Sequence, residues 1–371
     1  MATITPNGAK AKKTSAAKPS AAALIIAGGR GTRFWPESRG DRPKPLFAID
    51  GKTSLLAATI ARSATFIPRE RIFVLVSADQ RKPFAQAIEG LIPAANLLVE
   101  PEARGTAVAI VYGCAVIGHR LGQDTVAAVM PADHHVAPVS AFKATLTAAL
   151  ALAREQQTIV IIGIPPTRPE SGYGYMKIGR AAGHGAKQGF KADRFVEKPP
   201  LPTAQKMMRS GKFLWNAGMF VMPIRTLATE LELHAPALGE AMRGFTRLKP
   251  RELARVYGQL EFDSFDRVVA EKAAGILGVR AGFRWHDVGS WEGLWEAMRG
   301  DGADVITGNA LAIGSNGVLA RGGDRLMVLL GVDDLVAVDA GDVVLIARRS
   351  RSQEIRGVID ELKRRGLSRY L

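Results

Sequence analysis

A loop near the N-terminus carries the residue types that bind phosphate groups. It comprises Ala27, Gly28, Gly29, Arg30, Gly31 and Thr32, and Arg33 follows it. Glycine lets the backbone turn tightly and bring N–H groups to phosphate oxygens, and arginine adds a planar, permanently charged fork. Lys44, which stands between two prolines, adds a further cation. Together these residues predict a site for a triphosphate.

Two other phosphate-binding loops fit this sequence less well. A dinucleotide-binding loop needs a third glycine where this chain has Phe34, and its glycines must open a helix, which three nearby prolines would break. A P-loop needs an earlier glycine where this chain has Leu46. We therefore expect residues 51–53 to form a plain turn before a helix that starts near Ser54.

Two aspartates follow predicted strands and are candidate ligands of a metal ion. Asp133 comes just after the apolar run 126–130, and Asp287 lies between an apolar strand and a predicted helix over 291–298. Mg²⁺ is held by one or two carboxylates together with substrate phosphates and water, which suits this pair. Alternatively, Asp133 caps a loop and Asp287 starts the helix, although Ser290 is the better N-cap.

A third group of polar residues lies between the two aspartates. Glu197 and Lys198 end an alternating segment that Pro199 stops, and the alternation predicts that their side chains point to opposite faces of a strand. Such a pair by itself is a surface ion pair about as often as it is a binding site.

The elements that must position these residues alternate along the chain. Strands are expected at 71–76, 97–99, 126–130 and 158–164, and helices at 55–64, 81–89, 106–121 and 141–154. This alternation predicts an α/β fold with a doubly wound, mostly parallel sheet. Residues 172–200 are shorter, glycine-rich pieces, which predict antiparallel strands over one edge of the sheet and a place for a second substrate.

The C-terminal part has a different pattern. Residues 301–347 are short apolar runs separated by Gly, Asn and Asp, and a basic helix is expected at 352–365. Short strands with regular turns predict a small β unit.

The composition indicates a globular protein with a large core. Of the 371 residues, 47% are hydrophobic and 23% are charged. No apolar run approaches the roughly 20 residues of a membrane helix, and residues 1–20 contain lysines without the apolar core of a signal peptide. We therefore expect a disordered tail over residues 1–20, no membrane partner and a cytoplasmic location.

Three residues that often bind metals or form disulfides are expected to be structural here. Cys114 is the single cysteine, so it cannot form an internal disulfide, and we expect it in the core of a protein from a reducing compartment. His134 and His135 have no matching Cys/His cluster, so we expect them to pack in a turn rather than to bind zinc.

The net charge of +15 raises the question of a nucleic-acid partner. The excess is concentrated in the lysines of residues 1–20 and in the basic segment 348–371. There is no basic stripe interleaved with aromatic residues, so we expect no nucleic-acid partner, and anionic small substrates account for part of the excess.

The phosphate-binding segment also resembles a known family. Its sequence GGRGTRFWPESR, followed by RPKP, resembles the signature of the sugar-nucleotidyltransferases, and residues 34–39 resemble the mannose-1-phosphate guanylyltransferase branch. The resemblance extends from about Leu24 to the C-terminus. It implies a catalytic domain over residues 21–300 and a β-helix-like unit over 301–371.

The resemblance implies a role for each group of residues. It assigns the glycine loop to the nucleotide. It also assigns a second set of residues to the nucleotide, and these are Glu100, Gly105, Thr106, Ala107, Pro131 and Ala132. It assigns Asp133 and Asp287 to Mg²⁺. It assigns the sugar phosphate to Gly172, Tyr173, Gly174, Glu197, Lys198 and Asn216.

The base contacts of the family map to residues 100–107, which follow a strand and open a helix whose first N–H groups are free for a polar ligand. This chain has Gly105 where the family usually has Asn, and Pro45 where it usually has Gln. The identity of the base therefore stays open at this point.

The resemblance implies transfer of a guanylyl group from GTP to mannose 1-phosphate, with GDP-mannose and pyrophosphate as products. Such a transfer needs positioning and charge neutralisation rather than a protein nucleophile. In this hypothesis Lys198 aims the sugar phosphate at the α-phosphorus, and Mg²⁺ on the two aspartates bridges the reacting phosphates. Arg33 and Lys44 take up charge on the departing pyrophosphate.

Three alternatives remain from the sequence. The nearest is a thymidylyl- or uridylyltransferase that acts on glucose 1-phosphate. The others are a nicotinamide-dependent oxidoreductase and a non-catalytic sugar-nucleotide sensor, which would have no need of both acids, the arginine loop and Lys198 together. The sequence also leaves a homodimer open.

Overall fold

The computed structural model describes residues 21–28, 31–40, 42–183, 185, 189–261 and 263–371. The predictions for residues 1–20, for Gly29 and Arg30, and for the side chain of Thr32 fall outside the described residues.

A nine-stranded sheet with the order β3-β2-β1-β4-β9-β6-β10-β8-β7 forms the centre of the protein. Its first four strands are parallel, as expected from their continuous apolar runs. They are β1 (Ala21–Ile26), β2 (Ile72–Ser77), β3 (Leu97–Glu100) and β4 (Val126–Pro131). The predicted strands at 71–76, 97–99 and 126–130 are confirmed.

The second part of the sheet is mixed. Strand β9 (Phe213–Pro223) runs antiparallel between β4 and β6 (Val160–Ile164), and β10 (Leu277–Arg280) pairs parallel with β6. The edge is formed by β8 (Gly189–Val196) and β7 (Tyr175–Ala182), which are antiparallel to each other. The predicted antiparallel strands within 172–200 are confirmed.

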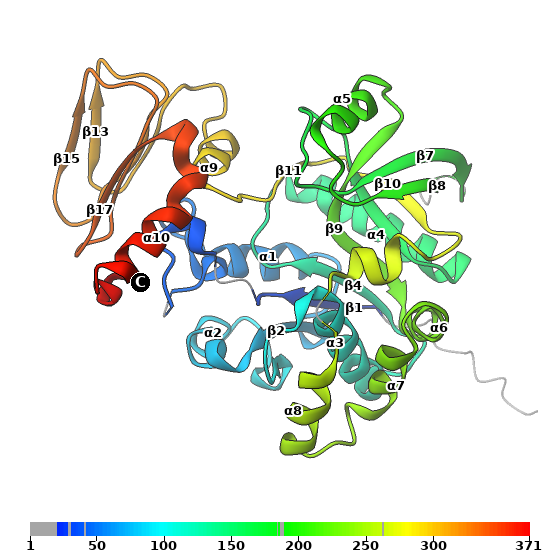
Figure 1. Cartoon of the computed structure of the whole chain (residues 1–371). Coiled ribbons are helices and arrows are strands. Elements are labelled where there is room, and N and C mark those ends of the chain that lie inside the picture. The colour runs from blue at the N-terminus through cyan, green and yellow to red at the C-terminus, as the bar shows by residue number, and fades with distance from the viewer. Residues whose placement is uncertain (1–20, 29–30, 41, 184, 186–188, 262) are drawn as a thin grey trace, which may run out of the picture.

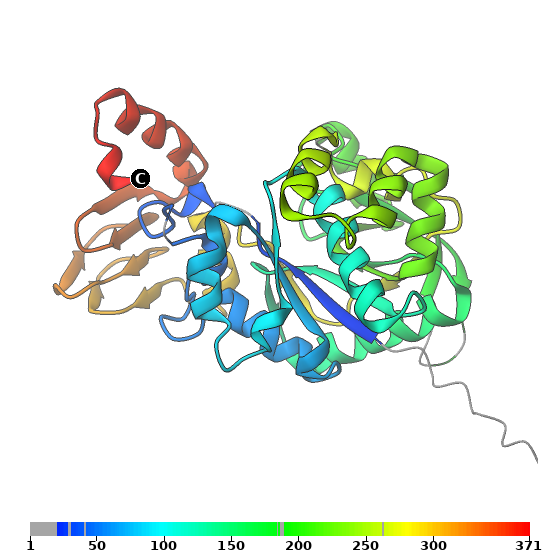
Figure 2. The same cartoon turned by 90° about the horizontal axis from the view of Figure 1, so that it is seen from below.

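Helices cover both faces of the sheet and give a three-layer architecture (Figures 1 and 2). One face packs against α1 (Leu55–Ser63), α2 (Arg81–Ala87), α4 (Val139–Gln156) and α5 (Leu201–Arg209). The other packs against α3 (Gly105–Leu121), α6 (Ile224–His234), α7 (Pro236–Gly244) and α8 (Pro250–Gln259). Cys114 is buried in α3, as expected. No helix in the described part of the chain is long and apolar enough to span a bilayer.

The C-terminal β unit, residues 305–371, lies at one side of the nine-stranded sheet (Figure 1). Strands β12 (Val305–Thr307), β14 (Leu319–Arg321) and β16 (Leu335–Asp339) stack in parallel, and β17 (Val344–Arg348) closes this sheet antiparallel to β16. Strands β13 (Ala310–Ile313) and β15 (Met327–Leu330) form a second parallel pair. Helix α10 (Ile355–Arg364) follows, so the predicted β unit and terminal helix are confirmed.

A shared hydrophobic core joins the C-terminal β unit to the segment 31–49, which we call the phosphate loop. Phe34, Trp35 and Phe47 of this loop pack with Trp291 of α9 (Trp291–Met298). Val338 of β16 belongs to the same core. The β unit is therefore packed behind the loop that carries the predicted phosphate ligands.

Candidate functional site

A cavity of about 370 Å³ opens at the carboxyl ends of β1, β3 and β4, the edge where the sequence predicted a nucleotide. Seven predicted site residues line it: Ala27, Gly28, Glu100, Gly105, Thr106, Pro131 and Asp133. The predicted residues Ala107 and Ala132 are buried beside it, where the Ala132 N–H donates to the Ile26 carbonyl. The cavity is the natural place for a nucleoside.

Gly31 lets the first residues of the phosphate loop pack against Lys44, which lies later in the same loop. Its φ is +59°, and a Cβ at this position would lie 2.2 Å from Lys44 Cβ. Any other residue would force the two segments apart. The glycine is therefore required to place the loop backbone directly beside the Lys44 side chain.

Lys44 connects the two predicted metal-binding aspartates. Its Nζ donates to Asp133 Oδ2 at 2.7 Å and to the backbone carbonyl of Asp287 at 2.9 Å. Burial alone would raise the pKa of Asp133, but the Lys44 ammonium holds that pKa below its usual value. Three segments far apart in the chain thus meet at one point of the sheet edge, and Asp133 is a carboxylate there.

The side chain of Asp287 points into the same region. A Cβ at Gly289 would lie 2.9 Å from Asp287 Oδ2 and 3.4 Å from Arg33 Nη1, so the carboxylate and the guanidinium are neighbours. The hydroxyl of Tyr173 hydrogen-bonds to Asp287. Val288, which follows, is buried and has a φ of +46°, a strained conformation for a β-branched residue that is typical of functional sites.

The two aspartates fit a divalent ion that also binds substrate phosphates. Among the described residues, no group of three or more His, Cys, Asp or Glu side chains could hold a metal ion. Two carboxylates, of which Asp133 lines the cavity, leave most of an octahedral shell for phosphate oxygens and water, which is how Mg²⁺ is usually held. Lys44, which contacts both residues, supplies positive charge at the same place.

His134 makes structural contacts with Trp285. Burial lowers the pKa of His134 to about 4, so its ring is neutral and Nδ1 accepts a hydrogen bond from Trp285 Nε1 at 3.0 Å. The ring also packs edge-on against Trp285. These contacts hold β11 (Arg284–His286) beside the segment that carries Asp133.

Glu100 is a buried carboxyl group in the wall of the cavity. One of its oxygens accepts a hydrogen bond from the hydroxyl of Tyr257, and the other faces Gly28. Burial raises the pKa of Glu100 to about 7, against the opposing effect of the Tyr257 hydrogen bond. A buried acid with a polar partner at a cavity is typical of a ligand-binding group.

The start of α3 is held by the segment after α8. Gly105 has a φ of +82°, and a Cβ there would lie 2.4 Å from the carbonyl oxygen of Asp263. Thr106 Oγ1 accepts a hydrogen bond from the Phe265 N–H at 3.0 Å. The Asn expected from the family would not fit this close approach, which explains the glycine in physical terms.

The predicted orientation of Glu197 and Lys198 is wrong. Strand β8 ends at Val196, and Lys198 has a φ of +45°, so the chain bends instead of continuing the alternation. Lys198 Nζ lies 2.8 Å from Glu197 Oε1, and the two side chains are therefore on the same side. Glu197 also lies against Gly174, where a Cβ would be 2.7 Å from Glu197 Oε2.

Asn216 of β9 lies in the same part of the molecule. Its side-chain amide donates to Asp266 Oδ1 at 2.6 Å, and its carbonyl oxygen accepts from the Gly218 N–H at 2.9 Å. Burial, with a contribution from Glu197, raises the pKa of Asp266 to about 6. Asp266 also lines the nucleoside cavity, so it connects the two halves of the site.

The other predicted sugar residues lie around two tryptophans. The ring of Tyr173 packs edge-on against Trp215 and Trp285, with centroid distances of 5.2 and 5.3 Å. The Gly172 N–H donates to Glu170 Oε1 at 2.9 Å. These contacts hold the glycine-rich segment 172–174 close to Asp287.

Tyr257 and Asp266 were not predicted from the sequence. Tyr257 is on α8 and Asp266 begins a π-helical turn (Asp266–Ala270), and neither belongs to one of the motifs that marked the other residues. The π-helical turn at Asp266, a feature frequent at functional sites, is visible only in the structure, so no sequence signal marked this residue.

Two family models match the chain. Residues 22–303 match the model described as Nucleotidyl transferase, and residues 308–362 match the MannoseP isomerase/GMP-like beta-helix domain.

Individual relatives cover nearly the whole chain. It is 37% identical over 358 residues to the Xanthan biosynthesis protein XanB of Xanthomonas campestris pv. campestris (strain B100), which covers 93% of this chain and 74% of that protein. It is 32% identical to a Mannose-1-phosphate guanylyltransferase of Escherichia coli, over 94% of this chain and 75% of that protein. A crystal structure described as mannose-1-phosphate geranyltransferase from Thermus thermophilus is 35% identical, with a TM-score of 0.84, over 93% of this chain and 99% of that chain.

Proposed function

The chain belongs to the nucleotidyl transferase family, and from this premise we propose that it transfers a guanylyl group from GTP to mannose 1-phosphate. The products would be GDP-mannose and pyrophosphate. The observation that carries the proposal is the meeting of Asp133, Asp287 and Lys44 beside the nucleoside cavity. Relatives named mannose-1-phosphate guanylyltransferase support the choice of substrates.

The phosphate loop would neutralise the triphosphate. Lys44 and the Arg33 guanidinium, which lies beside Asp287, place positive charge at the point where the leaving pyrophosphate would gain negative charge. Preorganised charges of this kind stabilise a transferring phosphoryl group without a protein nucleophile. Asp133 and Asp287 would hold a magnesium ion, which would supply further charge neutralisation at the reacting phosphates.

Glu100 supports guanine as the base. Guanine presents two adjacent donors, its N1–H and its amino group, and an ionised carboxylate is purely an acceptor. Uracil and thymine present one donor between two carbonyl oxygens, which a carboxylate would repel. The Tyr257 hydroxyl, bonded to one Glu100 oxygen, would fix the orientation of the carboxylate toward the base.

The sugar phosphate would bind between β8 and β9. Glu197 and the Asn216 amide supply groups for hexose hydroxyls, and Lys198 supplies a cation for the 1-phosphate. Lys198 would release Glu197 and hold the phosphate in line with the α-phosphorus of the nucleotide. The attacking oxygen of the sugar phosphate needs no general base, because this phosphate is already ionised at neutral pH.

The test is pyrophosphate release across a matrix of substrates. Purified chain is incubated with GTP, ATP, UTP, dTTP or CTP and with mannose 1-phosphate or glucose 1-phosphate, in Mg²⁺ and in EDTA. We expect the highest kcat/KM for GTP with mannose 1-phosphate, and no pyrophosphate release in EDTA. A preference for UTP or dTTP with glucose 1-phosphate would contradict the proposal and identify the other nucleotidyltransferase activity.

A further inference from the structure

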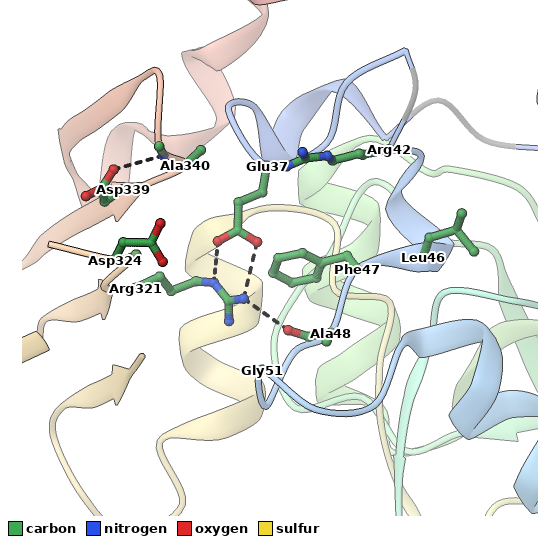
Figure 3. Close-up of a pocket in the computed structure, with 12 residues that line it drawn as sticks. Glu37, Arg42, Leu46, Phe47, Ala48, Gly51, Arg321, Asp324, Asp339 and Ala340 are labelled. Atoms are coloured by element: carbon green, nitrogen blue, oxygen red, sulfur yellow. Dashed lines mark hydrogen bonds and ion pairs between the residues drawn. The ribbon is translucent and has the colours of Figure 1, made fainter. Parts of the chain in front are cut away.

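Arg321 of the C-terminal β unit forms a buried ion pair with the phosphate loop. Its Nε donates to Glu37 Oε1 at 2.7 Å and its Nη2 to Glu37 Oε2 at 3.2 Å, a two-pronged contact (Figure 3). The Arg321 residue is 9% exposed. Paired contacts of this geometry are the strongest and most orientation-specific that arginine makes with a carboxylate.

The same guanidinium also holds the far end of the loop. It donates to the Ala48 carbonyl at 3.0 Å and to the Ile49 carbonyl at 2.8 Å, and it lies 4.4 Å from the centre of the Phe47 ring. Figure 3 shows Arg321 between Glu37 and Ala48, with Phe47 beside it. One side chain therefore fixes two points of the loop that are eleven residues apart in the chain.

Lys44 lies between these two points. The Phe47 N–H donates to the Lys44 carbonyl at 2.9 Å, and Lys44 Nζ lies 5.6 Å from the centre of the Phe34 ring, which packs on Phe47. A shift of the loop would therefore move the Lys44 ammonium relative to Asp133. Displacements of about 1 Å at a phosphate-binding group can change rates by up to about a hundredfold.

We propose that Arg321 is a positioning residue for pyrophosphate: by clamping Glu37 and the 48–49 carbonyls it holds Lys44 in place, so that the C-terminal β unit completes the phosphate site. This inference rests on the proposed function for the identity of the phosphate ligand. It assigns no contact between Arg321 and substrate, because Arg321 acts through the loop.

The experiment compares Arg321→Met with Arg325→Met in the reverse reaction, from GDP-mannose and pyrophosphate to GTP. Arg325 is a matched control, since it donates to Asp339 and to the Gly341 carbonyl inside the β unit. For Arg321→Met we expect the KM for pyrophosphate to rise about tenfold and the KM for GDP-mannose to stay within about twofold. Both constants should stay within about twofold in Arg325→Met.

A merely structural role would give a different pattern. Partial unfolding lowers the fraction of active enzyme, and hence kcat, without changing either KM, and that result for Arg321→Met would overturn the inference. Arg321→Lys keeps the charge but cannot reach Glu37 and both carbonyls, so its KM for pyrophosphate should be intermediate. If Arg321→Met does not fold, Glu37→Gln replaces it, with an expected rise of about threefold.

Calorimetric titration of the full chain with inorganic pyrophosphate and Mg²⁺ separates this inference from the proposed function. A wild-type protein inactive on GDP-mannose would contradict the proposed function, while weaker pyrophosphate binding by Arg321→Met than by Arg325→Met would still support the positioning role. Equal affinities of the wild type and Arg321→Met would refute it.

Discussion

The two lysines of the candidate site are held in opposite ways. The Lys44 side chain is 8% exposed, and its Nζ contacts Asp133 and the Asp287 carbonyl, which come from two other segments of the chain. The Lys198 side chain is 54% exposed and pairs with its own neighbour, Glu197. Lys44 is therefore held by tertiary contacts, and Lys198 by its neighbour in the chain.

Lys44 is therefore preorganised in its place, whereas Lys198 must leave Glu197 to bind a substrate. Lys44 has no freedom to leave its position without unpairing Asp133, so it is ready to neutralise charge as the nucleotide binds. The Lys198 side chain is exposed and can turn toward a phosphate in solvent, whereas the Glu197 carboxylate is only 6% exposed and loses a partner when Lys198 leaves it. Substitutions in the two halves should accordingly differ in their effects on stability, kcat and KM.

The largest effect is expected for Asp287→Asn. Loss of one of two metal carboxylates should lower kcat about a thousandfold at saturating substrates, while the melting temperature stays close to that of the wild type. Asp360→Ala, on the exposed face of α10, serves as the control. Steady-state pyrophosphate release over a Mg²⁺ titration is measured for both variants. Wild-type kcat and metal dependence in Asp287→Asn would show that Asp287 is not a metal ligand.

Lys44→Met should lower kcat about a hundredfold and also destabilise the fold, because Asp133 loses its ammonium partner. The pKa of Asp133 is held down in the folded state, so the stabilisation it reflects is present above the unfolded pKa and is lost as the pH falls. The gap in melting temperature between wild type and Lys44→Met should therefore shrink as the pH falls below about 4.

The control for this change is Lys52→Met, an exposed lysine in the turn that follows the phosphate loop. It removes the same charge from the same part of the sequence, and we expect no change in kcat. A constant melting-temperature gap across the pH range would show that Lys44 does not stabilise the Asp133 carboxylate.

Much of the fold was predictable because its periodicity is local. The apolar runs that form β2, β3 and β4 are bounded by turns, and the parallel arrangement follows from the helices between them. The position of β9 between β4 and β6 was not predictable in this way. Strand order depends on contacts between segments far apart in the chain, which no local pattern records.

The candidate site was predictable where residues follow strand ends. Asp133 was found because the carboxyl ends of parallel strands meet at one edge. Glu197 and Lys198 stay predicted site residues, but their predicted orientation was wrong, because a positive φ at Lys198 interrupts the alternation on which the prediction was based. Tyr257 reaches Glu100 from a helix 157 residues later, a contact set entirely by tertiary packing.

Lys198→Met should act on sugar-phosphate binding. We expect the KM for mannose 1-phosphate to rise about thirtyfold, the size of a lost charge-assisted hydrogen bond, with the KM for GTP unchanged. Lys206→Met, exposed on α5, is the control. A defect confined to the KM for GTP would show that Lys198 binds the nucleotide rather than the sugar phosphate.

The smallest effect concerns Glu100 and is a change in pH dependence. Burial raises the pKa of Glu100 to about 7, so its carboxylate fraction, and with it kcat/KM for GTP, should rise as the pH increases through 7. Glu100→Gln should be about tenfold less active on GTP at pH 8 and should lack this rise. Because the folded-state pKa is above the ordinary value of 4.5, the wild type loses stability as the pH rises from about 4.5 to about 7, so Glu100→Gln should gain melting temperature relative to the wild type between pH 5 and pH 8.

The substrate that sharpens this prediction is inosine triphosphate, which lacks the amino group of guanine. If Glu100 accepts hydrogen bonds from both N1–H and the amino group, the wild type should prefer GTP to inosine triphosphate, and Glu100→Gln should reduce that preference. Glu102→Gln is the matched control, because Glu102 is exposed and pairs with Arg104 in the same segment. An unchanged preference in Glu100→Gln would mean that other residues recognise the base.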